Sequence, residues 1–371
     1  MHLVRALADR SFDPAPRLFL VTRGSQAAGA GARVTDPQQA LGWGFGGTAA
    51  REYPELRTTL VDMPAEGGTD ALWTQLRHAD EEPWVALRDS ERLVPRLSRT
   101  RPDGGVVPLR PDRTYLVTGG LGGLGRVAAE RLVALGARHV AVLGRGGPDA
   151  GAAEWIAGLA ARGADVHTVR ADVADRAALE AALGALSREA PPVAGIVHAA
   201  GVLDDATLRT LTPERIALVL APKVLGAALL TELVPDTDFL ILFSSAAGLL
   251  GPAGQGSYAA ANAFLDAWAH ALAATGRPAL SLDWGAWSQV GMAADADRLP
   301  ALAGSGMASL SPAEGGELFE RLLGSSRRRL APIALDRAAL ERPSGLAAAH
   351  PILSELAGRP TAARPPRGSR P

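Results

Sequence analysis

The sequence predicts an α/β protein built on a doubly wound parallel sheet, and two observations carry this prediction. From Thr114 onward, short apolar runs alternate with amphipathic stretches of helical length, which is the pattern of repeated strand–helix units. The first apolar run leads directly into a glycine-rich segment, residues 118–125, that opens a helical stretch. The predicted strands lie in TYLVTG, HVAVLG, DVHTVRADV, AGIVHAAG, DFLILFSS and ALSLDWG.

The composition limits the class of function. A chain of 371 residues suggests about two domains. Its 38 basic and 39 acidic side chains leave a net charge of -1, which argues against nucleic acid as a main partner. The chain has no cysteine, which excludes disulfides and thiolate metal sites and fits a reducing cytoplasm. No metal site is expected.

The chain divides into three predicted regions. Residues 1–110 form a smaller domain with apolar runs in PRLFLVTRG and ELRTTLVDMP and a hairpin in WVALRDSERLVPRL. Residues 111–345 form the strand–helix domain, and residues 346–371 read as a disordered linker with little apolar content. Residues 239–265 carry no charge, but their Ser, Gly and Pro residues favour a buried strand, a loop and a helix over a membrane span.

A cofactor site is predicted where the glycine run lies between a strand and a helix. Glycines there let the backbone turn tightly and approach a pyrophosphate, which free N–H groups at the helix N-terminus would bind. The alternative is a flexible turn, but the strand–turn–helix context favours a dinucleotide. The run consists of Thr118, Gly119, Gly120, Leu121, Gly122, Gly123, Leu124 and Gly125.

Two residues at strand ends bear on which dinucleotide binds. Arg145 stands where an NAD-preferring site would place an acid for the ribose hydroxyls. Its guanidinium favours a 2′-phosphate and therefore NADP(H), unless Arg145 is a solvated surface residue. Asp172 ends the third strand and would either accept from the adenine amino group or cap a helix; the sequence leaves both open.

A catalytic constellation is predicted around Ser245 and Tyr258. Ser245 closes an apolar strand, Tyr258 follows thirteen residues later, and Asn262 would lie one helical turn beyond it on the same face. Lys223 and Asn262 are the only Lys and the only Asn of the chain, which is either chance or a sign of chemistry that no other residue type supplies. Taken singly, the Ser reads as a cap, the Tyr as packing and the Lys as a solvated side chain.

This spacing resembles the short-chain dehydrogenase/reductase family, whose Ser and Tyr follow a Thr-Gly-xxx-Gly-x-Gly loop. The usual member has Lys four residues after the Tyr, where this chain has Asn262. The departure matches ketoreductase domains of modular polyketide synthases, in which the Lys comes from the preceding helix; here it is Lys223. The resemblance runs from roughly Leu18 to Asp336 and implies that residues 1–110 are a truncated, non-catalytic Rossmann-like subdomain.

The resemblance implies an NADPH-dependent β-ketoacyl reductase. Its substrate would be a phosphopantetheine-linked chain on an acyl carrier protein, beside neighbouring synthase domains and in the cytoplasm, with neither nucleic acid nor a membrane as partner. Reducing a ketone leaves negative charge on oxygen, so a proton donor must stand ready. Tyr258 would be that donor and Ser245 would hydrogen-bond the same oxygen. Lys223 would lower the pKa of Tyr258, and Asn262 would hold the Lys or a relay water.

Further cofactor contacts follow from the resemblance. Trp284 and Trp287 come after the last long strand, where family members contact the nicotinamide and begin a mobile lid; core packing is the alternative. The Gly- and Ala-rich residues 292–310 are the predicted lid. The implied cofactor contacts are Asp172, Val173, His198, Ala199, Ala200, Gly201, Trp284 and Gly285.

One motif bears on stereochemistry. Leu203, Asp204 and Asp205 look like the Leu-Asp-Asp motif of B-type ketoreductases, which guides the pantetheine arm so that the product is D-configured. Gln255 is placed with this motif as a substrate-guiding residue. The alternative for the two aspartates is an acidic turn that caps the helix beginning in ATLRTLTPERI.

Three positions near the Tyr agree with this subtype. The opposing type has a Trp eight residues before the Tyr, where this chain has Leu250. Epimerising members carry Pro where this chain has Ala253 and Ala260, so reduction without epimerisation is expected. Two other functions stay open, a redox-inactive structural domain and a free-standing reductase of small ketones. The retained Tyr, Asn and loop glycines argue against the first, and the extra N-terminal segment argues against the second.

Overall fold

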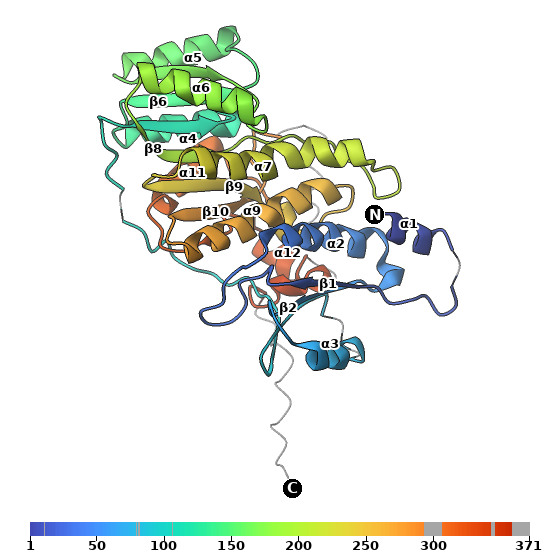
Figure 1. The fold of residues 1–371 in the computed structure, drawn as a ribbon. Helices are drawn as coiled ribbons and strands as arrows, with labels where there is room; N and C mark the ends of the chain where they lie inside the picture. Colours follow the sequence, from blue (N-terminus) through green and yellow to red (C-terminus); the bar gives the residue numbers. More distant parts are fainter. Residues whose placement is uncertain are drawn as a thin grey trace.

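The computed structural model describes residues 1–10, 12–78, 80, 82–105, 107–292, 306–342 and 346–357. Within them, the larger domain holds a seven-stranded parallel sheet in the order β12-β10-β9-β8-β5-β6-β7 (Figure 1). The predicted fold class is therefore confirmed. The strands are β5 (Thr114–Thr118), β6 (His139–Gly144), β7 (Asp165–Arg170), β8 (Val193–His198), β9 (Phe239–Ser245), β10 (Ala279–Trp284) and β12 (Arg329–Leu330).

Helices cover both faces of this sheet. One face packs against α4 (Gly123–Ala134), α5 (Ala150–Ala161) and α11 (Pro312–Leu322). The other packs against α6 (Arg176–Glu189), α7 (Pro213–Leu233) and α9 (Gly256–Ala274). Alternate residues of β5 belong to different cores, with Tyr115 and Val117 in the first and Leu116 in the second. This alternation within a fully buried strand is what a sheet covered on two sides requires.

The strand order reverses between β5 and β8. Chain order runs outward through β6 and β7 on one side of β5 and through β9 and β10 on the other. Ligands of doubly wound sheets bind in the crevice at the carboxyl ends of the strands at such a point. The last residues of β5 and β8 are joined here by a hydrogen bond between Thr118 Oγ1 and His198 Nδ1, which lie 2.7 Å apart. Both side chains are fully buried.

The N-terminal subdomain has a four-stranded sheet of its own. The strands β1 (Phe19–Arg23), β2 (Thr59–Met63) and β3 (Trp84–Arg88) are parallel, and β4 (Glu91–Leu93) pairs antiparallel with β3. The predicted hairpin is thus confirmed, with its turn at Asp89, whose φ is 47°. The helices of this part are α1 (His2–Ala8), η1 (Pro37–Gln39), α2 (Ala40–Glu52), η2 (Pro54–Leu56) and α3 (Thr69–Leu76).

The N-terminal subdomain lies against α9 through α2 (Figure 1). The approach is so close that a Cβ on Gly44 would stand 2.1 Å from the carbonyl oxygen of Ala259. At the end of α2, the Glu52 carboxylate accepts from the backbone N–H groups of Gly254 at 2.8 Å and Leu208 at 2.7 Å. The N-terminal subdomain therefore binds two loops of the larger domain.

The C-terminal segment departs from the expectation of a disordered linker over 346–371. Residues 346–357 include α13 (Leu346–Ala349) and η3 (Pro351–Leu353), whose apolar side chains pack on Leu250. The Leu97 N–H donates to the carbonyl of Ile352 at 2.7 Å. The apolar residues here are few but gain enough burial to dock, and residues 358–371 lie outside the described part.

Smaller elements are α8 (Ala246–Leu250), β11 (Met307–Ala308), β13 (Ala334–Leu335) and α12 (Arg337–Glu341).

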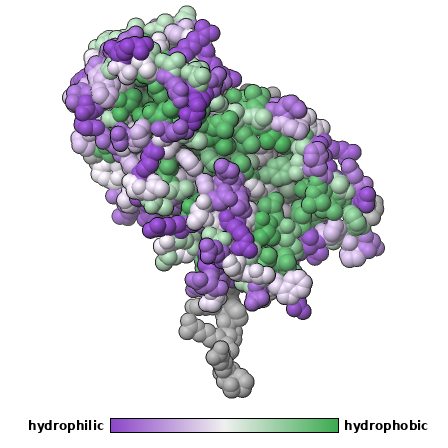
Figure 2. Space-filling view, viewed as in Figure 1, coloured by the Kyte–Doolittle hydropathy of each residue, from purple (hydrophilic) through white to green (hydrophobic). Residues whose placement is uncertain are grey.

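The outer side of α7 is apolar. Figure 2 shows hydrophobic side chains gathered over this helix, where Leu218 and Leu225 are exposed. Among the described helices, α7 alone is long and apolar enough to cross a membrane by length and composition. A core helix passes the same test, and α7 packs against α9 through its other side.

Candidate active site

A cavity of about 1020 Å³ opens at the carboxyl ends of the strands, at the upper end of the usual range for ligand sites. It reaches from the glycine loop past the end of β9 to the start of α9. The predicted site residues that line it are Gly119, Leu121, Gly122, Gly123, Leu124, Gly125, Arg145, Ala199, Ala200, Gly201, Leu203, Asp205, Ser245, Gln255, Tyr258, Trp284 and Gly285.

The glycine loop forms a cradle suited to a pyrophosphate. Gly119 has a φ of 66°, and a Cβ on Gly125 would stand 2.2 Å from the Gly119 carbonyl oxygen, so neither position accepts a larger residue without strain. Gly122 is the N-cap of α4 and supplies no side chain to the first N–H groups of the helix. The start of α4 lines the cavity. Its free N–H groups and the positive end of the helix dipole suit an anionic group there.

Several predicted cofactor contacts do not reach the cavity wall. Asp172 is exposed, and its Oδ1 accepts from the N–H of Ala174 at 2.9 Å, while Asp175 caps α6. Asp172 therefore closes a local turn with its side chain and does not cap α6. The other predicted residues that do not line the cavity are Thr118, Gly120, Val173, His198, Asp204, Lys223 and Asn262.

Ser245 and Tyr258 meet inside the cavity. Ser245 is the N-cap of α8, and its Oγ accepts from the N–H of Ala247 at 3.2 Å, so the capping interpretation holds as well. The Ser245 hydroxyl also hydrogen-bonds the Tyr258 side chain, which acts to lower the pKa of Tyr258. A pair of hydroxyls on one cavity wall can bind one ligand oxygen jointly.

Lys223 lies directly behind the wall of the cavity. Its Nζ stands 5.7 Å from the centre of the Tyr258 ring and donates to the carbonyl of Phe243 at 2.7 Å. A Cβ on Gly201, which lines the cavity, would stand 3.1 Å from Lys223 Cε. Burial lowers the pKa of Lys223 to about 8, against an opposing influence from Asp266. Lys223 therefore stays mainly protonated at neutral pH and loses its proton as the pH rises through about 8.

The net pKa of Tyr258 is raised in this structure, whereas the sequence predicted a lowered value. Burial raises the pKa of Tyr258, and the hydrogen bonds with Ser245 and Asn262 only partly oppose this effect. The physical reason is burial of the phenol, while the Lys223 ammonium lies 5.7 Å from the ring centre and donates to the Phe243 carbonyl. Tyr258 is therefore protonated at neutral pH, which is the state that a proton donor needs.

Asn262 supports the helix that carries Tyr258. Its Nδ2 donates to the Tyr258 carbonyl at 2.8 Å, and its own carbonyl accepts from Ser244 Oγ at 3.2 Å. The expected contact with Lys223 is not formed, because the ammonium is bound by Phe243. The Asn262 Oδ1 is buried and has no hydrogen-bond partner among the described residues, so it can accept from a water.

The two aspartates of the Leu-Asp-Asp motif have different partners. Asp204 Oδ2 accepts from Arg215 Nε at 2.8 Å, and this bond lowers the pKa of Asp204. Asp205 Oδ2 accepts from Gln255 Nε2 at 3.0 Å, which ties the motif to the start of α9. Thr212 caps α7, so the motif is not the cap of that helix. Asp204 fixes the loop, while Leu203, Asp205 and Gln255 face the cavity.

Trp284 and Trp287 are core residues that also line the cavity. Both are buried, and their rings meet edge to face with centroids 5.0 Å apart. Trp284 also contacts Phe243 with centroids 5.5 Å apart. Each of the two tryptophans therefore packs in the core and also lines the cavity. Of the predicted lid, residues 293–305 lie outside the described part of the chain.

The sequence did not point to every residue that lines the cavity. Arg51 of α2 and His350 of the C-terminal segment both line it and contact each other. Burial and then Arg51 lower the pKa of His350 to about 3. No local pattern could have joined these two residues, which lie 299 positions apart. A second guanidinium was also missed beside Arg145, whose carbonyl accepts from Arg170 Nε at 3.1 Å.

Two family models match the chain. The model described as the KR domain matches residues 113–289. The model described as "Polyketide synthase extender module SpnB, Rossmann fold domain" matches residues 1–97. Together they cover the four-stranded sheet and every strand of the seven-stranded sheet except β12.

Curated relatives are polyketide synthases, in agreement with the two family models. The chain is 41% identical over 370 residues to the spectinabilin polyketide synthase system protein NorA' of Streptomyces orinoci, covering 97% of this chain and 10% of that protein. It is 42% identical over 370 residues to the polyketide synthase GfsE of Streptomyces halstedii, covering 96% and 9%. The chain thus spans about a tenth of these relatives.

Solved structures match over nearly the whole chain. An A-type ketoreductase from a modular polyketide synthase has a TM-score of 0.87 and 35% identity, covering 96% of this chain and 77% of that one. The ketoreductase from the first module of phoslactomycin biosynthesis in Streptomyces sp. HK803 has a TM-score of 0.86 and 34% identity, covering 95% and 84%. The chain therefore belongs to the ketoreductase domains of modular type I polyketide synthases.

Proposed function

We propose that this chain uses NADPH to reduce a β-ketoacyl thioester, carried on an acyl carrier protein, to a D-β-hydroxyacyl thioester. The observation that carries the proposal is that Ser245 and Tyr258 line one end of a cavity whose other end is the glycine loop, with Lys223 directly behind Tyr258. The membership in a ketoreductase family supports the reaction class.

The cavity residues fit NADPH. The loop of Gly119 to Gly125 would hold the pyrophosphate, and Arg145, exposed at the end of β6, would bind the 2′-phosphate. When bound, the cofactor supplies a hydride. Arg170 places a second positive charge next to Arg145 and strengthens the preference for a phosphorylated ribose.

The proton comes from the chain. Tyr258 is protonated because burial raises its pKa, and its hydroxyl would donate to the ketone oxygen while Ser245 donates a second hydrogen bond. As negative charge develops on that oxygen, the buried Lys223 ammonium would stabilise the tyrosinate left behind. A relay water between Lys223 and Asn262 Oδ1 would return the proton.

The stereochemical proposal is B-type reduction without epimerisation. It is supported by Leu203, Asp205 and Gln255 on the cavity wall, and by Leu250 rather than a Trp eight residues before Tyr258. Leu250 packs against Leu346 of the C-terminal segment, so the space of a bulkier side chain is already taken.

The wider setting is proposed from the relatives. Residues 1–110 would serve as a structural subdomain, residues 111–345 as the reductase and the last residues as a link to further synthase domains in the cytoplasm. The curated relatives are about ten times longer than this chain, which leaves room for a carrier domain elsewhere in the polypeptide.

The test is turnover of a β-ketoacyl thioester of N-acetylcysteamine or pantetheine by the purified chain, followed by NADPH absorbance and chiral analysis of the product. We expect turnover with NADPH, much less with NADH, and the D product. Binding of NADPH without turnover would establish the redox-inactive alternative. An L product would overturn the B-type assignment while leaving the reductase proposal intact.

A further inference from the structure

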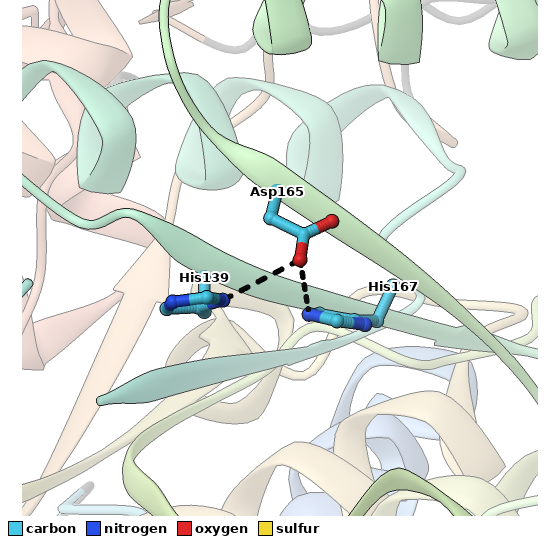
Figure 3. Close-up of side chains that lie close together, drawn as sticks. All are labelled: His139, Asp165 and His167. Carbon is cyan, nitrogen blue, oxygen red and sulfur yellow. Dashed lines mark ion pairs between the residues drawn. The ribbon is translucent and has the colours of Figure 1, made fainter. Parts of the chain in front are cut away.

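Two of the seven histidines of the chain meet one aspartate far from the cavity (Figure 3). His139 is the first residue of β6, and Asp165 and His167 are the first and third residues of β7. The strands are in register with His139 opposite Asp165. Residues two apart on a strand share a face, so all three side chains project on one side of the sheet.

The ligand atoms converge on one carboxylate oxygen. His139 Nδ1 lies 3.6 Å and His167 Nε2 lies 3.3 Å from Asp165 Oδ2. All three ligand atoms lie within 4.8 Å of one another. Two nitrogens and one oxygen around a tetrahedral Zn²⁺, with bonds of about 2.0 to 2.1 Å, stand about 3.3 Å apart. The two nitrogen–oxygen separations are close to that spacing.

The two histidine nitrogens form no hydrogen bond with the residues that the structure describes. His139 Nδ1 and His167 Nε2 are both buried at the atomic level and have no hydrogen-bond partner among the described residues. Their rings are nearly parallel, with an angle of 22° and centroids 5.9 Å apart. Asp165, in contrast, is exposed. The arrangement leaves one open side through which an ion and its remaining water ligands could enter.

The surroundings favour a cation. The three side chains project on the face covered by α6, as their strand neighbours Leu143 and Val169 pack with Leu179 and Leu186 of that helix. α6 runs back across the sheet from the end of β7 to the start of β8, so its negative C-terminal end lies at the same edge as the cluster.

We propose that His139, Asp165 and His167 form a binding site for a divalent transition-metal ion, with Zn²⁺ as its ligand of choice. Imidazole and carboxylate ligands in a three-residue set suit Zn²⁺ and exclude a preference for Mg²⁺, which binds oxygen ligands. No cysteine is needed for such a site. The proposal departs from the expectation of no metal site, because the two imidazoles lie on different strands and meet only in the fold.

The role of the ion is structural rather than catalytic. The cluster lies at the amino ends of β6 and β7, whereas the glycine loop and Arg145 follow the carboxyl ends of β5 and β6. A six-residue strand separates them by roughly 20 Å. The ion would clamp β7, the edge strand of the sheet, to β6. We therefore expect it to raise the stability of the chain and to leave the kinetics of reduction unchanged.

The test is titration of the full chain, free of any polyhistidine tag and treated with EDTA, with Zn²⁺ alone in a calorimeter. We expect one Zn²⁺ per chain, a higher thermal unfolding midpoint with Zn²⁺, and no such effect with Mg²⁺. Protons should compete with Zn²⁺ for the imidazole nitrogens, so affinity should be lower in acid. Co²⁺ in place of Zn²⁺ should give the visible absorption of a low-coordinate nitrogen and oxygen site.

The variants His167→Ala and Asp165→Asn should each weaken Zn²⁺ binding about tenfold or more. The control is His78→Ala, because His78 Nε2 also stands near an aspartate, 3.5 Å from Asp80 Oδ2, without a second histidine. NADPH binding by each variant reports whether it is folded. Absence of saturable binding near one equivalent would overturn the site, as would equal affinity in wild type and His167→Ala.

Discussion

The buried ammonium of Lys223 sets the acid–base behaviour of the site at the level of single residues. Burial lowers its pKa to about 8, while burial raises the pKa of Tyr258 above its ordinary value. The two groups therefore titrate in separate pH ranges. As the pH rises, Lys223 loses its proton before Tyr258 does.

This order predicts the pH profile of the reductase. As the pH rises through about 8, Lys223 becomes neutral and can no longer stabilise charge on Tyr258, so kcat/KM should fall. A profile of kcat/KM from pH 6 to 10 checks this expectation. A descending limb that begins only near the ordinary pKa of tyrosine, about 10, would assign the loss to Tyr258 and remove Lys223 from the mechanism.

At the level of elements, the N-terminal subdomain shapes the substrate side of the cavity. Glu52, at the end of α2, binds the N–H groups of Gly254 and Leu208. Gly254 precedes Gln255, and its carbonyl accepts from the Ala206 N–H at 2.8 Å, directly after the Leu-Asp-Asp motif. The N-terminal subdomain thus positions both loops to which we assign a substrate-guiding role.

Glu52→Gln should separate substrate binding from cofactor binding. The amide has one acceptor where the carboxylate has two, so one loop N–H loses a charge-assisted bond of about 1.5 to 3 kcal/mol. We expect a higher KM for the thioester and a less pure D product, with an unchanged Kd for NADPH. The exposed Glu55 supplies the control, Glu55→Gln. Equal KM values for the two variants would mean that Glu52 has no positioning role.

Gly44→Ala tests the contact of α2 with α9. The new Cβ would stand 2.1 Å from the Ala259 carbonyl oxygen, so the helices must separate at a cost of about 1 to 3 kcal/mol. Urea unfolding measures the loss. Gly184→Ala in α6 is the matched control, because no atom lies within 4 Å of its added Cβ, and we expect it to be neutral or stabilising by up to about 1 kcal/mol. If Gly44→Ala were as stable as the control, the close contact would be absent in solution.

For the whole molecule, three buried histidines predict acid sensitivity. Burial lowers the pKa of His198 and of His350 to about 3 and that of His270 to about 4. The unfolded chain binds these protons near pH 6.5, so below that pH it gains protons that the folded chain does not. Stability therefore falls as the pH drops from 6.5 toward 4, by up to about 1.4 kcal/mol per pH unit for each residue.

Urea unfolding at pH 7.0, 6.0 and 5.0 measures how the free energy of unfolding changes with pH. His350→Asn should reduce this dependence by the contribution of one histidine. An unchanged slope in the variant, or equal stability at the three pH values, would contradict the buried neutral state of His350.

The sequence anticipated some levels of this structure and not others. Strands from Thr114 onward were readable because most are buried apolar runs next to a glycine or polar turn. The Ser245 to Tyr258 spacing was readable because only the short helix α8 and one loop separate the two residues. The short strand β12 has two residues and no pattern. The Arg51 to His350 contact, like the His139 cluster, depends on tertiary packing that no local pattern encodes.

The measurement that tests the central claim most directly compares wild type with Tyr258→Phe and Tyr53→Phe in NADPH oxidation with a β-ketoacyl thioester. Tyr53 ends α2 outside the cavity, so its variant should match wild type. Tyr258→Phe should bind NADPH normally and lose turnover by about 10² to 10⁴, the usual worth of a proton donor. Wild-type turnover in Tyr258→Phe would contradict the account, because the proton would then come from elsewhere.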